Sequence, residues 1–174
     1  MKKYYNLFAI IMISGLLKGS GTFTAEEQSA LNKLYANGVN LPGAIERGDI
    51  NAARLLIKAG ADVNSGCPIV IACGNGDMEM VKLLTEQHAD VNCIHVYGNR
   101  LKFTPLMEAA RCGNCGINSK DPERCKKCVE VAKFLLEHGA EVNKQIGLYT
   151  PLNWAQMNPN DSMKALLLQY GAKT

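Results

Sequence analysis

The sequence predicts an all-α solenoid, in which short helix-turn-helix units follow one another and are joined by hairpin-like loops. A closing phrase recurs along the chain, as AGADVN at 59–64, HADVN at 88–92, HGAEVN at 138–143 and a shortened YGAKT at 170–174. A stretch with helical apolar spacing precedes each phrase, and a second, shorter helical stretch precedes that one. Recurrence in a fixed order is the sequence signature of a repeat array.

The units begin and end with residues that suit short helices. Threonine and proline at 104–105, and again at 150–151, would cap a helix and fill its first position, where proline is favoured. The paired alanines at 109–110 would let that helix lie close to its neighbours. Gly139 follows the second helix of its helix pair, at a position where a left-handed residue is favoured. His88 takes the equivalent position in the helix pair that ends with HADVN.

These motifs resemble the ankyrin repeat. The openings match the family's TPLH, with Met107 and Asn153 in place of its histidine. The resemblance covers about residues 39–172 and implies an ankyrin-repeat solenoid that acts as a non-catalytic scaffold, presenting loops and first-helix faces to a protein partner. The expected organisation is a signal peptide at 1–21, an N-terminal capping helix at 22–38, repeats at about 39–64, 67–92, 104–143 and 150–174, and a Cys-rich insert at 111–128.

The N-terminus has the order of a secretory signal peptide. It consists of Lys2 and Lys3, an apolar run at 7–17, and small residues at Gly19 and Gly21. The apolar run is too short to cross a bilayer as a helix, so we expect no stable membrane span in the mature chain. Cleavage near residue 21 would give a periplasmic or secreted protein; without cleavage the chain would be membrane-anchored or cytoplasmic.

The charge balance argues against a nucleic-acid partner. Residues 1–21 contain three of the nineteen basic side chains and none of the sixteen acidic ones, so the rest of the chain has sixteen of each. Nucleic-acid binding depends on a basic surface that neutralises phosphates. The histidines, serines and cysteines form no recognisable catalytic spacing. We therefore expect a monomer that is not an enzyme, binds no nucleic acid, and binds an unidentified protein.

The loops between repeats supply the candidate binding residues. Aromatic side chains and arginine are enriched at interface hot spots. The predicted partner-binding residues are Tyr97, Arg100, Lys102, Phe103, Arg111 and Tyr149. Tyr97 and Arg100 are expected to be exposed. Phe103 has two interpretations, since it could project toward a partner or fold inward to cover the base of its hairpin.

The insert holds two CxxC pairs, which an antiparallel helix pair would bring together. Cys112, Cys115, Cys125 and Cys128 could bind one structural zinc ion as a tetrahedral thiolate site. The same arrangement suits nested disulfides, Cys112–Cys128 and Cys115–Cys125, which an oxidising compartment would favour. A redox-active dithiol is the third alternative. The second function hypothesis is therefore a metal- or redox-responsive binding module.

The other three cysteines carry weaker signals. Cys73 replaces the second of the paired alanines, so we expect a core residue. Cys67 takes the place of the capping threonine, and Cys93 begins a loop. A Cys67–Cys93 bond is conceivable in an oxidising compartment, but nothing in the sequence places the two residues together.

Overall fold

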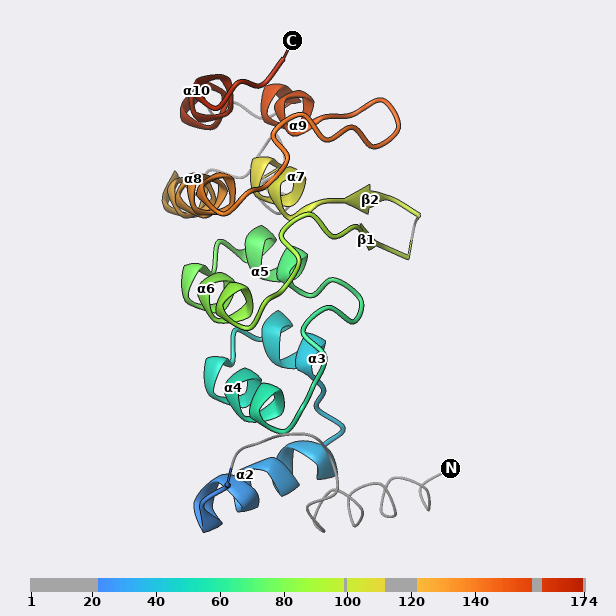
Figure 1. Cartoon of the computed structure of the whole chain (residues 1–174), viewed down its shortest axis with the longest axis vertical. Coiled ribbons are helices and arrows are strands. Elements are labelled where there is room, and N and C mark those ends of the chain that lie inside the picture. Colours follow the sequence, from blue (N-terminus) through green and yellow to red (C-terminus); the bar gives the residue numbers. More distant parts are fainter. Residues whose placement is uncertain (1–21, 99, 112–121, 158–160, 174) are drawn as a thin grey trace. The chain divides into compact units, whose positions relative to one another are not determined.

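The computed structural model describes residues 22–98, 100–111, 122–157 and 161–173, and this part of the chain is mostly helical (Figure 1). The ankyrin solenoid that the sequence predicts is confirmed, with helix pairs that follow one another and one short hairpin among the described residues. The chain divides into two units, residues 1–62 and 63–174. In the described ranges, no helix combines the length and apolar character that crossing a membrane requires.

The first unit contains three described helices, α2 (Ala25–Ala36), α3 (Leu41–Glu46) and α4 (Ile50–Lys58). Helix α4 packs against both of the others. Helix α2 lies within the segment expected to cap the array. It begins with a reciprocal cap, in which the Thr24 hydroxyl accepts from the Glu27 amide and the Glu27 carboxylate accepts from the Thr24 amide.

The second unit is two rows of helices with loops on one side. The first helices of successive repeats form one row and the second helices form the other (Figure 1). The first row is α5 (Ile69–Asn75), α7 (Pro105–Ala110) and α9 (Pro151–Met157), and the second row is α6 (Met78–Glu86), α8 (Pro122–Glu137) and α10 (Asp161–Gln169). A hairpin of β1 (His95–Val96) and β2 (Lys102–Phe103) precedes α7, with His95 opposite Phe103.

The predicted threonine caps are confirmed in two repeats. The Thr104 hydroxyl accepts from the Met107 amide at 3.2 Å, and the Thr150 hydroxyl accepts from the Asn153 amide at 3.3 Å. Cys67 stands at the equivalent position before α5, and that helix has no side-chain cap. Cys67 has a φ of 57°, a left-handed conformation that costs free energy in a residue other than glycine.

Helix α8 starts earlier than the sequence suggests. The insert was expected to extend to Cys128, but α8 begins at Pro122, so the returning half of the insert is helical. Proline is favoured in the first turn of a helix, and the acidic Glu123 interacts favourably with the positive end of the helix dipole. Cys125 and Cys128 therefore lie on the first turns of a helix and not in a loop.

The asparagine that ends each closing phrase bridges to the next closing turn. Its side-chain amide donates to one backbone carbonyl and its oxygen accepts from an amide two residues later. Asn92 donates to the Gly139 carbonyl at 3.0 Å and accepts from the Glu141 amide at 2.8 Å. Asn64 makes the same pair of contacts with His88 and Asp90, and Asn143 makes them with Gly171 and Lys173.

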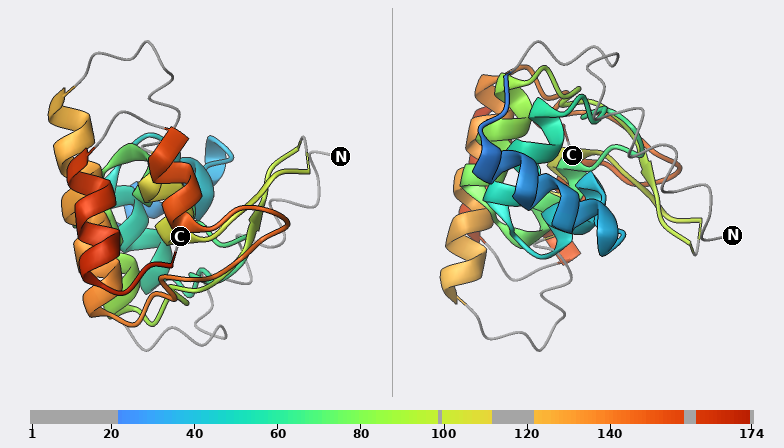
Figure 2. Two further views of the ribbon diagram at one scale, coloured as in Figure 1. Left: turned by 90° about the horizontal axis from the view of Figure 1, so that it is seen from above. Right: turned by 90° about the horizontal axis from the view of Figure 1, so that it is seen from below.

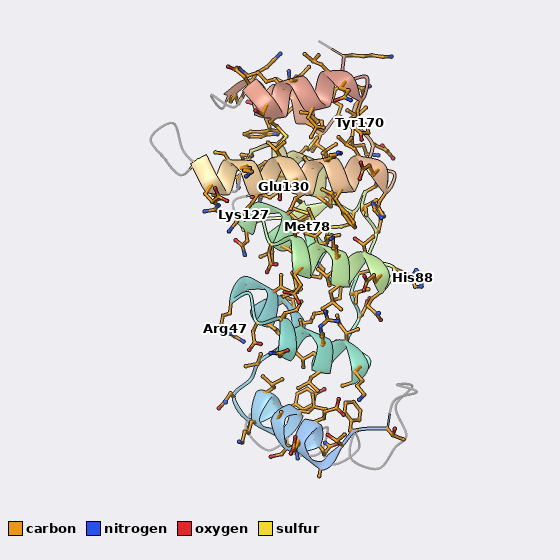
Figure 3. The ribbon with its side chains drawn as sticks, turned by 90° about the vertical axis from the view of Figure 1, so that its left-hand side faces the viewer. Arg47, Met78, His88, Lys127, Glu130 and Tyr170 are labelled. Atoms are coloured by element: carbon orange, nitrogen blue, oxygen red, sulfur yellow. A yellow bond between two sulfur atoms is a disulfide. The ribbon has the colours of Figure 1, made fainter. Side chains whose placement is uncertain are left out.

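The bridged turns share a left-handed residue. Gly139 and Gly171 have φ values of 89° and 86°, and His88 has the same conformation at 65°. The His88 side chain is exposed beyond the end of α6 and points away from the helices (Figure 3). The backbone geometry of the turn is thus kept where glycine is missing, as the sequence predicts for a histidine.

Replacing Asn92 with alanine tests the bridge. The variant loses two hydrogen bonds that are partly exposed, so we expect the free energy of unfolding to fall by about 1–2 kcal/mol. Urea denaturation of the whole chain measures the change. Asn75→Ala is the control, because Asn75 is an exposed residue at the end of α5 and the described part of the chain shows no side-chain hydrogen bond from it. Equal losses in the two variants would contradict a bridging role.

Candidate protein-binding surface

Two loops of the second unit project beyond the row of first helices. We call residues 93–98 and 100–103 the long finger and residues 144–149 the short finger. Both extend away from α6, α8 and α10 (Figures 1 and 2). The long finger is closed by the β1–β2 pairing and by a hydrogen bond from the Tyr97 amide to the Leu101 carbonyl at 2.9 Å. The short finger is closed by a bridge between Ile146 and Tyr149.

Phe103 is buried at the base of the long finger, with 1% of its surface exposed. Its ring centroid lies 5.1 Å from that of Trp154, and the Arg111 guanidinium lies over the ring at 4.6 Å. The inward interpretation of Phe103 is therefore the correct one, and its place among partner-contacting residues is withdrawn. Phe103 is buried because it directly precedes Thr104, the N-cap of α7, where the chain enters the helix layer.

Tyr97 is half-buried, against the expectation that it would be exposed. Its ring packs edge-on to His95 at 4.5 Å and to Phe103 at 5.6 Å. Burial raises the pKa of the Tyr97 phenol to about 12, and the negative charge of Glu108 adds to the rise. The half-buried Tyr97 ring therefore helps to attach the finger to the helices, and its contact with a partner stays a prediction.

A buried ion pair lies beneath the finger. Glu108 is 3% exposed, and its Oε1 accepts from Arg111 Nη2 at 2.8 Å. A Cβ atom at Gly74 of the neighbouring α5 would lie only 2.9 Å from this oxygen, so the carboxylate occupies the space that glycine leaves. Arg111 neutralises Glu108 and covers Phe103 with its side chain 22% exposed, and its contact with a partner stays a prediction. A buried charge requires such pairing.

The finger tips carry apolar and cationic side chains together. Leu148 is 84% exposed, Val96 54% and Leu101 45%. Arg100 and Lys102 are exposed beside them, and Tyr149, which packs on Trp154, keeps 39% of its surface open. We define the finger surface by the exposed residues of both tips, which are Val96, Arg100, Leu101, Lys102, Leu148 and Tyr149.

Charge on the fingers is of one sign. The sequence from 93 to 103 and from 144 to 149 contains no aspartate or glutamate. Lys144 pairs with Glu141 at 2.9 Å, which leaves Arg100 and Lys102 as the exposed cations of the finger surface. Sequence reasoning found these two cations but missed Val96, Leu101 and Leu148. These three residues could have been identified from the sequence, because each is an apolar residue within a turn-rich segment.

The predicted metal ligands are only partly within the described residues. Cys112 and Cys115 lie outside them. Cys128 is fully buried, with its sulfur next to Gly76, while Cys125 is half-buried one turn earlier. Arg124 donates to the Gly74 carbonyl at 2.8 Å, which holds the start of α8 against α5. Across the described ranges, no three His, Cys, Asp or Glu side chains gather as a metal site would require. The zinc and nested-disulfide alternatives remain predictions.

The remaining cysteines differ from one another. Cys73 is fully buried, as predicted, and burial together with the charge of Glu108 raises the pKa of its thiol. Cys67 and Cys93 lie at disulfide distance, with Cα atoms 5.9 Å apart. His95 reinforces this junction, because its Nδ1 lies 2.6 Å from the Gly66 carbonyl oxygen. A bond between these two cysteines is conceivable from the sequence, but only the fold places them together.

Comparison with known families agrees with this fold. A model of ankyrin repeats in three copies matches residues 41–118, and a model of a single ankyrin repeat matches residues 102–146. Together the two matches extend over more than half of the chain. This chain belongs to the ankyrin repeat family, whose members generally bind other proteins and are generally non-catalytic.

Three relatives share parts of the chain. YahD of Escherichia coli (strain K12), which is named as an ankyrin repeat protein, is 26% identical over 154 residues, covering 67% of this chain and 72% of the relative. The ankyrin repeat protein L91 of Acanthamoeba polyphaga mimivirus is 42% identical over 41% of this chain. Alpha-latrocrustotoxin-Lt1a of Latrodectus tredecimguttatus is 34% identical over 58% of it. The matches span only 10% and 6% of the last two relatives.

Alkaline titration tests the burial of Tyr97. The phenol has a pKa of about 12 in the folded chain and about 10 when unfolded, so its neutral form stabilises the fold below about pH 10. We expect that contribution to be lost as the pH rises from about 10 to about 12. The difference in ultraviolet tyrosinate absorbance between wild type and Tyr97→Phe isolates this titration. A difference that titrates fully near pH 10 would show that the ring is exposed.

Proposed function

We propose that this chain is a non-catalytic scaffold that binds a protein partner through the finger surface. The observation that carries the proposal is the exposure of large apolar side chains beside cations on two adjacent loops. Surface apolar groups of this size gathered together indicate an interaction site. The bases of the two fingers are held by packed aromatic rings, and the Glu108–Arg111 ion pair lies beneath the long finger. A pre-ordered surface loses less entropy when it binds.

The chemistry of the finger surface favours a partner segment with both acidic and apolar side chains. Arg100 and Lys102 would attract carboxylates, while Val96, Leu101 and Leu148 would be covered by apolar groups. Opposite charges steer the encounter, and apolar burial supplies most of the affinity. The Tyr149 ring lies next to these residues, with its centroid 4.8 Å from that of Trp154, and its 39% exposed surface offers an aromatic contact.

Changing the finger tips should abolish binding without unfolding the chain. Leu101→Asp with Leu148→Asp places charge where apolar contact is needed, and we expect affinity to fall roughly tenfold or more. A peptide array whose members vary independently in acidic and apolar content measures this. Leu168→Asp is the matched control, because Leu168 on α10 is 50% exposed, close to the 45% of Leu101, and does not belong to the fingers.

The outcomes of this test separate the alternatives. Binding of acidic, apolar peptides that is weakened by salt and lost in the finger variant supports the proposal. Binding that survives in the finger variant, or that is lost equally in the control, would overturn it. Circular dichroism of all variants establishes that the helices remain folded.

We also propose, as a second candidate function, that the insert binds zinc or responds to thiol oxidation. Support comes from the two CxxC pairs and from Cys125 and Cys128, which lie one turn apart at the start of α8. Residues three apart lie on the same side of a helix, so both sulfurs could face one ion. Export through the signal-like residues 1–21 would favour disulfides over zinc.

Metal analysis of the purified chain, combined with thiol counting, distinguishes these chemistries. One zinc ion per chain, with Cys112, Cys115, Cys125 and Cys128 protected from alkylation until a chelator is added, is the result expected for a structural zinc site. Absence of metal with the four thiols oxidised supports nested disulfides. Four free, readily alkylated thiols with no bound zinc, which stay reduced when a disulfide oxidant is added, would overturn this second candidate function.

A further inference from the structure

The first strand of the long finger has an attachment that does not involve the insert. Cys93 is the first residue of the finger, and Cys67 occupies the turn before α5, twenty-six positions earlier. Their Cα atoms are 5.9 Å apart, near the most common separation of about 5.5–6 Å in disulfides. Cys67 is 4% exposed and Cys93 is half-buried, so Cys93 is the more accessible thiol.

We propose that Cys67 and Cys93 are a reversible disulfide site through which thiol oxidation fixes the first half of the finger surface. The proposal concerns the order of the finger and does not depend on which partner the finger binds. It assigns these two cysteines a role separate from the four cysteines of the insert.

The contacts around β1 show why this bond matters. On the other side of the hairpin, Phe103 is buried and anchors β2 directly to the helices. Strand β1 contains no fully buried side chain: it pairs with β2 over two residues, His95 contacts the Gly66 carbonyl, and the half-buried Tyr97 ring that follows packs edge-on to His95 and Phe103. Both His95 and Cys93 attach to the same turn at 64–67. Breaking the covalent attachment leaves β1 with noncovalent contacts to the 64–67 turn and to β2, while the buried Phe103 still holds β2.

The turn that receives Cys93 is itself well fixed. The Cys67 amide donates to the Asn64 carbonyl at 3.1 Å, and the Asn64 side chain bridges to His88 and Asp90. The left-handed backbone of Cys67 aims its side chain away from the usual capping position, and α5 is left without a side-chain cap. Cys67 therefore stands where other repeats have a capping threonine, and it provides the position at which Cys93 of the finger can be attached covalently.

The oxidant is a low-molecular-weight disulfide such as glutathione disulfide. The Cys93 thiolate attacks one sulfur, the glutathione disulfide bond breaks, and the departing glutathione thiolate takes a proton. The Cys67 thiolate then attacks the Cys93 sulfur of the mixed disulfide and releases the second glutathione. Two protein thiols and one glutathione disulfide are consumed, and one protein disulfide and two glutathione thiols are formed. Excess reduced glutathione drives the same steps backwards.

Peptide mapping of the full chain tests whether the bond forms. After equilibration with glutathione disulfide, trypsin should release a cross-linked pair of peptides, residues 59–82 and 83–100. Cys73 lies on the first peptide too, so the variants decide the assignment. The link should be lost in Cys67→Ser and kept in Cys73→Ala, which restores the family's paired alanines. Absence of the linked pair, or its loss in Cys73→Ala, would overturn the proposal.

Hydrogen exchange tests whether the bond orders the finger. We expect backbone amides at 93–97 to exchange roughly tenfold faster or more in reduced than in oxidised wild type, with the Phe103 amide little changed. Cys67→Ser should exchange like the reduced protein under both conditions, and Cys73→Ala should respond like wild type. If Cys67→Ser fails to fold, the reduced wild type still gives the comparison. Equal exchange at 93–97 in the two redox states would show that the bond does not control the finger.

Discussion

The asparagine bridge sets the geometry on which the second unit depends. Each bridge joins the closing turn of one repeat to that of the next through two backbone groups, as Asn92 does with Gly139 and Glu141. Because both a donor and an acceptor are used, the two turns can meet in only one register. The loops that follow the turns are then presented at a fixed spacing. A binding surface made from separate loops requires that constancy.

The fingers can present an ordered binding surface because their bases are packed against the helices. Phe103 and Tyr97 pack onto the helices, and Arg111 covers Phe103 while it neutralises Glu108. Trp154 packs against Phe103 of the long finger and against Tyr149 of the short finger, so the bases of the two fingers contact the same aromatic ring. Side chains that resemble hot-spot residues in the sequence are thus used internally, and smaller apolar residues at the tips remain for a partner.

Local rules explain what could be predicted from the sequence. The helix caps, the closing turns and the left-handed His88 depend on neighbours within a few residues, and these features were found. Phe103 and Tyr97 could not be placed, because hairpin register decides which side each ring faces. The Cys67–Cys93 contact joins distant positions through the fold, and the burial of Glu108 depends on a glycine in another repeat. The start of α8 at Pro122 was not predicted, because the polar, cysteine-rich composition of the insert suggested a loop as far as Cys128.

Gly74 has a consequence for how this protein can change. Ankyrin repeats are commonly regarded as interchangeable modules, but the second repeat here leaves a space that only the Glu108 carboxylate of the third repeat fills. A side chain at position 74 would force that carboxylate to shift, and shortening Glu108 would remove its ion pair with Arg111. Positions 74 and 108 are therefore coupled across two repeats, and a redesign of either repeat has to treat these two residues as a pair.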